Sequence, residues 1–148
     1  MINGINSREM ILEILLEIEE GEHSHVAIRN ALSKYQFLPK QDRAFITRVC
    51  EGTLEYRIQI DYIINSFSKV TVDKMKPAIR EILRSAVYQL KYMDSVPDSA
   101  VCNEAVKLAQ RKGFYNLKPF VNGVLRTIAR EMDKVSFPKK EEDLLKYL

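Results

Sequence analysis

The segments Pro97-Asp-Ser-Ala-Val-Cys-Asn-Glu-Ala-Val106 and Phe120-Val-Asn-Gly-Val-Leu-Arg126 decide the fold more clearly than any other part of the chain. Each has apolar residues at helical spacing, interrupted by polar residues at positions that a helix ordinarily buries. These interruptions are Asn103, Glu104 and Asn122. A buried amide or carboxylate is costly unless it is hydrogen-bonded. We therefore expect these side chains to link the two helices to each other.

The rest of the chain also repeats its apolar residues at the spacing of an α-helix. The expected inward positions are Ile11, Ile14, Leu15 and Ile18; Ala27, Ile28, Ala31 and Leu32; Phe45, Val49 and Cys50; Ile60, Ile63, Ile64 and Phe67; Ile79, Leu83, Ala86 and Leu90; Val101, Ala105 and Leu108; and Val121, Val124, Leu125 and Ile128. Ser7, Ser24 and Asp73 are the expected caps of three of these helices. No strand alternation or hairpin signal occurs. The sequence therefore predicts an all-α fold.

Size and composition indicate one globular domain. The 148 residues carry a net charge of only +3. Two distant cysteines on helical stripes, Cys50 and Cys102, fit free buried thiols in a reducing compartment better than a disulfide. No apolar run has membrane-spanning length, and the first residues lack a signal-peptide pattern. These features predict a cytoplasmic protein with no membrane partner.

Charge is distributed unevenly along the chain. Residues 1–38 carry 3 Lys/Arg against 6 Asp/Glu, whereas residues 69–135 carry 13 against 7. Such asymmetry is typical of a phosphate-binding face, although a lysine-rich solvated surface explains it equally well. Basic residues repeat at helical spacing on three helices of the second half, and we expect these ridges to face water. The candidate RNA-contacting residues are Lys76, Arg80, Arg84, Lys91, Lys107, Arg111, Lys112, Arg126 and Arg130.

Unpaired bases also stack on exposed aromatic rings, for which Tyr56, Tyr92, Phe114 and Tyr115 are candidates. No catalytic or metal-binding pattern emerges from the sequence. His23 and His25 have no further ligands at suitable spacing, so we expect no metal site. The glutamates between residues 13 and 22 are interpreted as the solvated face of the first helix.

Five segments in order resemble the NusB-like RNA-binding domain. They are Leu38-Pro-Lys-Gln-Asp-Arg-Ala44, Glu51-Gly-Thr-Leu-Glu-Tyr-Arg57, Ile82-Leu-Arg-Ser-Ala-Val-Tyr-Gln-Leu90 and the two segments quoted first. The resemblance implies a helical bundle of about six to seven helices in two packed halves, about 1–68 and 69–135. It also implies structural roles for the motif residues Asp42, Arg43, Gly52, Asn103, Glu104, Asn122 and Gly123. Gly52 within a helical pattern indicates close packing or a bend.

Details of these segments are similar to one branch, the N-terminal domain of the RsmB (Sun) family of 16S ribosomal-RNA cytosine-C5 methyltransferases. They are Gly52-Thr-Leu54 followed by Arg57, Tyr88-Gln-Leu90, and Leu125-Arg126. This resemblance implies a substrate-recognition fragment whose partners are ribosomal RNA and its own methyltransferase domain. Residues 136–148 would then begin the linker to that domain, which would bind S-adenosylmethionine.

The fragment itself is expected to hold no cofactor and to have no enzyme activity, whereas the longer parent would be an enzyme. Its five glycines are scattered, and neither cysteine follows a proline as the nucleophile of that family does. Two alternatives remain open. One is a free-standing NusB-type transcription antitermination factor that binds RNA together with a protein partner. The other is an interdomain docking module that binds no RNA.

Overall fold

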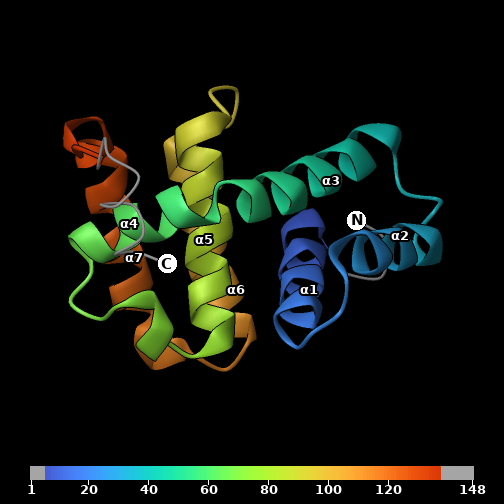
Figure 1. Ribbon diagram of the computed structural model, residues 1–148, viewed down its shortest axis with the longest axis horizontal. Helices are drawn as coiled ribbons and strands as arrows, with labels where there is room; N and C mark the ends of the chain where they lie inside the picture. Colours follow the sequence, from blue (N-terminus) through green and yellow to red (C-terminus); the bar gives the residue numbers. More distant parts are fainter. Residues whose placement is uncertain (1–5, 138–148) are drawn as a thin grey trace.

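The computed structural model describes residues 6–137, and these form seven α-helices and no strand (Figure 1). The helices are α1 (Ser7–Glu19), α2 (Ser24–Lys34), α3 (Lys40–Glu55), α4 (Arg57–Phe67), α5 (Pro77–Tyr92), α6 (Asp98–Arg111) and α7 (Lys118–Glu131). Short 3-10 turns cover Val72–Lys74, Tyr115–Leu117 and Met132–Lys134. The predicted all-α class is confirmed.

Helix α5 is the centre of the molecule. It packs against α1, α3, α4, α6 and α7, and α3 runs across it from the arm that carries α2 (Figure 1). Every side chain from Glu81 to Leu90 is buried. The expected apolar stripe accounts for part of this burial. The buried polar residues of α5 need hydrogen-bond partners, because a buried polar group without one is strongly destabilising.

Arg84 obtains its partners from two carboxylates. Its Nε donates to Oδ1 of Asp61 at 2.8 Å and its Nη2 to Oδ2 at 2.9 Å, while Nη1 donates to Oε2 of Glu81 at 2.6 Å. Only 10% of the Arg84 side chain is exposed. The prediction that Arg84 faces water was therefore wrong. The basic ridge flanks the apolar stripe of α5, and α4 covers that flank with Asp61.

The buried carboxyl of Glu81 makes a testable contribution to stability. Burial raises its pKa from the ordinary value of 4.5, although Arg84 opposes the shift. A raised pKa means that the folded state binds the proton more tightly than the unfolded state, so stability decreases as pH rises from about 4.5 through the folded-state pKa. Glu81→Gln removes this titration. We expect the difference in free energy of unfolding, Glu81→Gln minus the unmodified protein, to increase from pH 4 to pH 7 in urea titrations. A difference that does not change with pH would contradict the raised pKa of Glu81.

Gly52 of α3 lies directly against the Tyr88 ring of α5. A Cβ atom at this position would lie 2.1 Å from both Cε1 and Cζ of Tyr88. The Tyr88 ring belongs to a group with Tyr56 and Tyr92, whose own rings stack with centroids 4.5 Å apart. The close packing expected at Gly52 is confirmed, and a hydrogen atom is the only side chain that fits there.

The helix starts differ from the expected caps. Asn6, not Ser7, caps α1, and its Oδ1 accepts the Glu9 amide at 2.8 Å. Ser24 is already the first residue of α2. Asp73 lies in a 3-10 turn and accepts the Thr71 hydroxyl, because α5 begins only at Pro77, a residue that suits a first helical turn.

At the other end of the chain, Tyr62 donates its hydroxyl proton to the carbonyl of Ser136 at 2.9 Å. The remainder of the expected linker, residues 138–148, lies outside the described residues. Within residues 6–137, no helix has both the length and the apolar character needed to cross a membrane.

Candidate nucleic-acid interface

Outward-facing polar side chains meet where α6 packs against α7. Lys118 donates to Oε1 of Gln110 at 2.8 Å, and Nη2 of Arg126 donates to Oδ1 of Asn103 at 2.9 Å. These two bridges show that the helices run antiparallel. We call this surface the α6–α7 seam and define it by Asn103, Lys107, Gln110, Lys118, Asn122 and Arg126.

The polar residues of the opening motif do link α6 to α7, but they do so at the surface. Asn103 is exposed, and Glu104 and Asn122 are half-buried, so the expectation of buried amides and carboxylates was wrong. Arg126 makes the link, because its Nε also donates to Oδ1 of Asn122 at 3.2 Å. Glu104 instead contacts Lys107 on its own helix at 3.6 Å. Asn103, Lys107 and Gln110 are exposed because, within residues 6–137, no other element covers this side of α6.

The seam is positively charged. The Lys107 side chain is 60% exposed, Lys118 and Arg126 are half-buried, and Glu104 is the neighbouring acid. Arg130 continues the line of Lys118, Asn122 and Arg126 at four-residue spacing; its side chain is 66% exposed and lies 3.3 Å from Glu131. Lys118 was not among the candidates from the sequence. Its place in this four-residue series was the signal that would have identified it.

Tyr115 adds an exposed aromatic ring at the end of the seam. Tyr115 is 64% exposed, and the Lys118 ammonium lies 4.6 Å from the centroid of its ring. The other three aromatic candidates pack within the protein. Phe114 packs against the core, and Tyr56 stacks on Tyr92, whose hydroxyl donates to Gln59 at 2.7 Å. Tyr115 is therefore the one candidate of the four with an open face.

Several predicted basic residues lie elsewhere and are held by acids or aromatic rings. Arg111 lies 3.4 Å from Glu9, and Lys112 is paired with Glu13, so both face α1. Arg80 is paired with Glu19 and donates to the Met75 carbonyl at 3.0 Å. Lys91 lies 5.4 Å from the ring centroids of Tyr92 and Phe137, and Lys76 is exposed at the start of α5. The predicted residues thus do not form one surface.

The remaining motif residues are structural or exposed. Nη1 of Arg43 donates to the Leu32 carbonyl at 3.0 Å, which attaches α3 to the end of α2. Asp42 lies in the first turn of α3, where the helix dipole favours a carboxylate. Gly123 is exposed, and no atom would lie within 4 Å of a Cβ there.

Residues 6–137 contain no set of three His, Cys, Asp or Glu placed to hold a metal ion. Burial raises the pKa of Cys50 to about 12 and also raises the pKa of Cys102, so both thiols stay protonated near neutral pH. His23 and His25 lie next to each other, with ring centroids 6.1 Å apart.

Comparison with known proteins identifies the family. The model of the NusB family matches residues 5–130, which include all seven helices apart from the last residue of α7. The chain belongs to the NusB family. The resemblance inferred from the five sequence segments is therefore confirmed.

Curated NusB-family relatives are of two kinds. "Probable ribosomal RNA small subunit methyltransferase B" of Bacillus subtilis is 35% identical over 124 residues, which are 84% of this chain and 28% of that protein. "Transcription antitermination protein NusB" of Dictyoglomus thermophilum is 33% identical over 134 residues, which are 90% of this chain and 88% of that protein. The chain therefore spans less than a third of its methyltransferase relatives and most of its NusB relatives.

Solved structures agree with the NusB fold. NusB of T. maritima is 26% identical with a TM-score of 0.76, covering 84% of this chain and 89% of that one. A structure of the antitermination factors NusB and NusE in complex with dsRNA matches with the same TM-score at 21% identity, covering 84% and 93%. The second likeness shows the fold alone.

Proposed function

We propose that this NusB-family domain binds RNA along the α6–α7 seam and acts, together with a protein partner, in transcription antitermination. The observation that carries the proposal is the seam itself, which carries Lys107, Lys118 and Arg126 and ends at the exposed ring of Tyr115, next to Lys118. Cationic side chains bind the phosphate backbone, and an open aromatic ring stacks on an unpaired base.

Arg126 is positioned for this role before any ligand binds. Two of its donor groups, Nε and Nη2, are held by the oxygens of Asn122 and Asn103, which fixes the plane of the guanidinium. The N–H groups on Nη1 remain as donors for a phosphate oxygen. A fixed guanidinium loses less side-chain entropy on binding than a mobile lysine does.

Antitermination is supported by the relatives, because NusB proteins match this chain over most of their length. The second candidate is substrate recognition for a ribosomal-RNA cytosine-C5 methyltransferase. The 35% identity to the Bacillus subtilis protein favours it. In that case S-adenosylmethionine binds to a catalytic domain outside these residues.

Two observations separate the candidates. A methyltransferase domain encoded in frame after Leu148 would support the second candidate. Terminator readthrough on adding the purified chain to a transcription extract would support the first.

RNA binding itself is tested with the double variant Lys107→Glu/Lys118→Glu. Fluorescence-anisotropy titrations with a single-stranded RNA oligonucleotide at two salt concentrations should show at least about tenfold weaker binding. The slope of log K against log salt should fall by about 1.4–1.8, because two phosphate contacts are lost. Tyr115→Ala should weaken binding by about 1–3 kcal/mol with an unchanged slope, since stacking releases no counterions.

The control is Arg29→Glu/Lys40→Glu, which changes the net charge by the same amount as Lys107→Glu/Lys118→Glu. Arg29 is an exposed residue of α2, and Lys40 is the exposed first residue of α3. It should bind RNA with nearly unchanged affinity and salt slope. Equal weakening by both double variants would mean that net charge rather than the seam determines affinity. No RNA binding by the unmodified protein would favour the docking-module alternative.

A further inference from the structure

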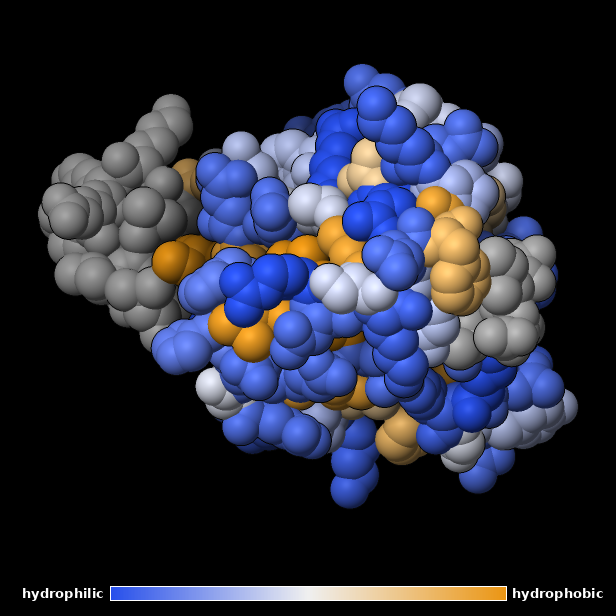
Figure 2. Space-filling model, turned by 90° about the vertical axis from the view of Figure 1, so that its right-hand side faces the viewer, coloured by the Kyte–Doolittle hydropathy of each residue, from blue (hydrophilic) through white to orange (hydrophobic). Residues whose placement is uncertain are grey.

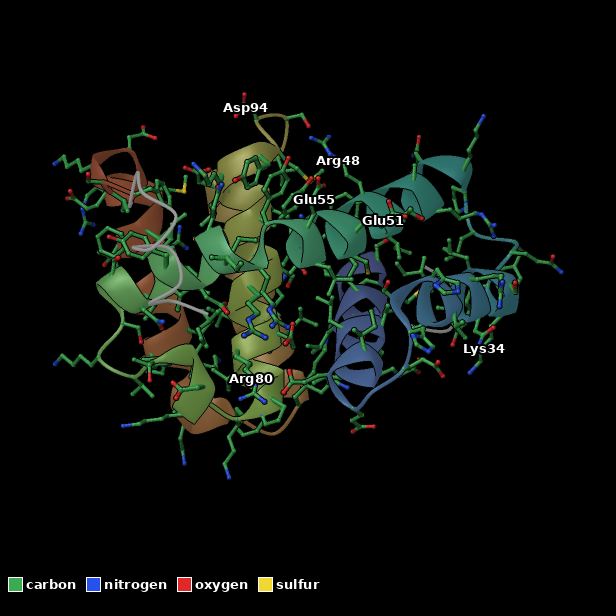
Figure 3. The ribbon with its side chains drawn as sticks, viewed as in Figure 1. Lys34, Arg48, Glu51, Glu55, Arg80 and Asp94 are labelled. Carbon is green, nitrogen blue, oxygen red and sulfur yellow. The ribbon has the colours of Figure 1, made fainter. Side chains whose placement is uncertain are left out.

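Helices α1 and α2 form a groove of about 380 Å³. It is built from the first part of the chain, whereas the seam is built from α6 and α7. Met10 and Ile14 of α1 form its floor with Ala31 of α2 and Tyr35, the residue that directly follows α2, and each pair is spaced by four residues. Glu9, Glu13 and Glu17 form the α1 wall, and Asn30 and Lys34 form the α2 wall (Figure 3 labels Lys34). We call this surface the α1–α2 groove.

The apolar part of the groove extends onto the surface through Phe37. The Phe37 ring is in edge contact with Tyr35, with centroids 6.2 Å apart, yet 56% of the residue is exposed. On the face turned toward the viewer in Figure 2, apolar side chains lie in furrows between polar ones. Phe37 thus extends the apolar surface of the groove, and contiguous exposed apolar surface is typical of protein-binding sites.

Charge is concentrated at one end of the α1–α2 groove. Glu9 and Glu13 are paired with Arg111 and Lys112. Glu17 also lines an adjoining hollow with Glu20 and Glu22. Within residues 6–137, no ion pair engages Glu17 or Glu20. The carbonyl end of the α1 dipole adds to this negative potential.

We propose that the α1–α2 groove binds an amphipathic helix of a protein partner, with its basic residues placed against Glu17 and Glu20. Two helices separated by an apolar furrow accept a third helix, whose side chains at four-residue spacing enter between Met10, Ile14, Ala31 and Tyr35. The uncompensated glutamates select cations and repel phosphates. The α1–α2 groove is thus a protein-binding surface, separate from the α6–α7 seam, and this inference does not depend on RNA binding.

The test uses a synthetic helical peptide of about 14 residues, built from leucine on one face and lysine on the other. Titration into methyl-labelled protein should give saturable NMR shift changes at Met10, Ile14 and Ala31. The same peptide with glutamate in place of lysine should bind at least about tenfold more weakly, because charge complementarity is reversed. RNA oligonucleotide should leave these three methyl signals unchanged.

Matched variants separate the groove from general effects. Glu17→Lys/Glu20→Lys should weaken peptide binding about tenfold or more, whereas Glu51→Lys/Glu55→Lys, an equal change on exposed residues of α3 (Figure 3), should change it less than about twofold. Phe37→Ser should also weaken binding, and Ile58→Ser, at another exposed apolar residue, should not.

Three results would overturn the proposal. They are no peptide binding at millimolar concentration, shift changes that avoid the groove methyls, and equal loss of affinity in the Glu51→Lys/Glu55→Lys variant. RNA-induced shifts at Met10, Ile14 and Ala31 would instead assign the groove to nucleic acid and also reject a protein-binding role. The three peptide results do not bear on the seam, whose variants are measured by RNA binding.

Discussion

Arg84→Met is expected to lower the free energy of unfolding by about 3–5 kcal/mol, because it leaves Glu81 buried without the cation that compensates it. Asp61 on α4 loses both of its hydrogen bonds in the same variant. Methionine fills similar volume, so the loss reports on the ionic contacts rather than on a cavity. Urea denaturation at pH 7 measures the effect.

Two further variants test this explanation. Arg80→Met, one turn earlier on α5, breaks a more exposed pair with Glu19 and should cost only about 1 kcal/mol. In the double variant Glu81→Gln/Arg84→Met, part of the lost stability should return, since no buried charge is left on α5. Equal costs for the Arg80 and Arg84 variants would contradict the argument from burial.

Gly52→Ala is expected to destabilise the protein by about 1–3 kcal/mol despite the higher helix propensity of alanine. The new methyl group overlaps the Tyr88 ring, and that ring is buried beside Tyr56 and Tyr92, so it has little room to move. Thermal or urea unfolding measures the change. Gly123→Ala is the matched control, because its helical site is open and alanine should be neutral or stabilising by up to about 1 kcal/mol.

The clash predicts a strong coupling between the two positions. In a Tyr88→Leu background the shorter side chain leaves room for the methyl group, so Gly52→Ala should become neutral or stabilising. Additive costs of Gly52→Ala and Tyr88→Leu would show that the glycine is required for a reason other than the Tyr88 ring.

The helices could be predicted from the sequence because burial of one face imposes a helical period on the apolar residues. The predicted stripe positions of α1, α5 and α7 are all buried except Ile18, which is half-buried, although α5 buries further residues outside its stripe. Gly52 was recognisable as a close contact because glycine is unfavourable inside a helix. Its partner, Tyr88, was not recognisable, since no local pattern states which helices meet.

The candidate site was less predictable for the same reason. Arg80 and Arg84 have the helical spacing of a solvent-facing ridge, but α1 and α4 supply Glu19 and Asp61 against them. Whether a charge at the edge of an apolar stripe is buried depends on the neighbouring helix, which the spacing on one helix does not reveal. The α6–α7 seam likewise depends on the antiparallel packing that brings Gln110 to Lys118 and Asn103 to Arg126.

The central place of α5 has a consequence for how the chain folds during synthesis. Helix α1 is made first, yet its apolar stripe packs on α3 and α5. Roughly 70 residues separate the end of α1 at Glu19 from the end of α5 at Tyr92. At about 5–20 residues per second the ribosome needs roughly 4–15 s to make that stretch. Until α5 is complete, Ile11, Ile14 and Leu15 lack part of the surface that buries them in the finished protein, because α2 and α3 alone do not supply it. The nascent chain therefore exposes part of α1 to chaperones before the core can close.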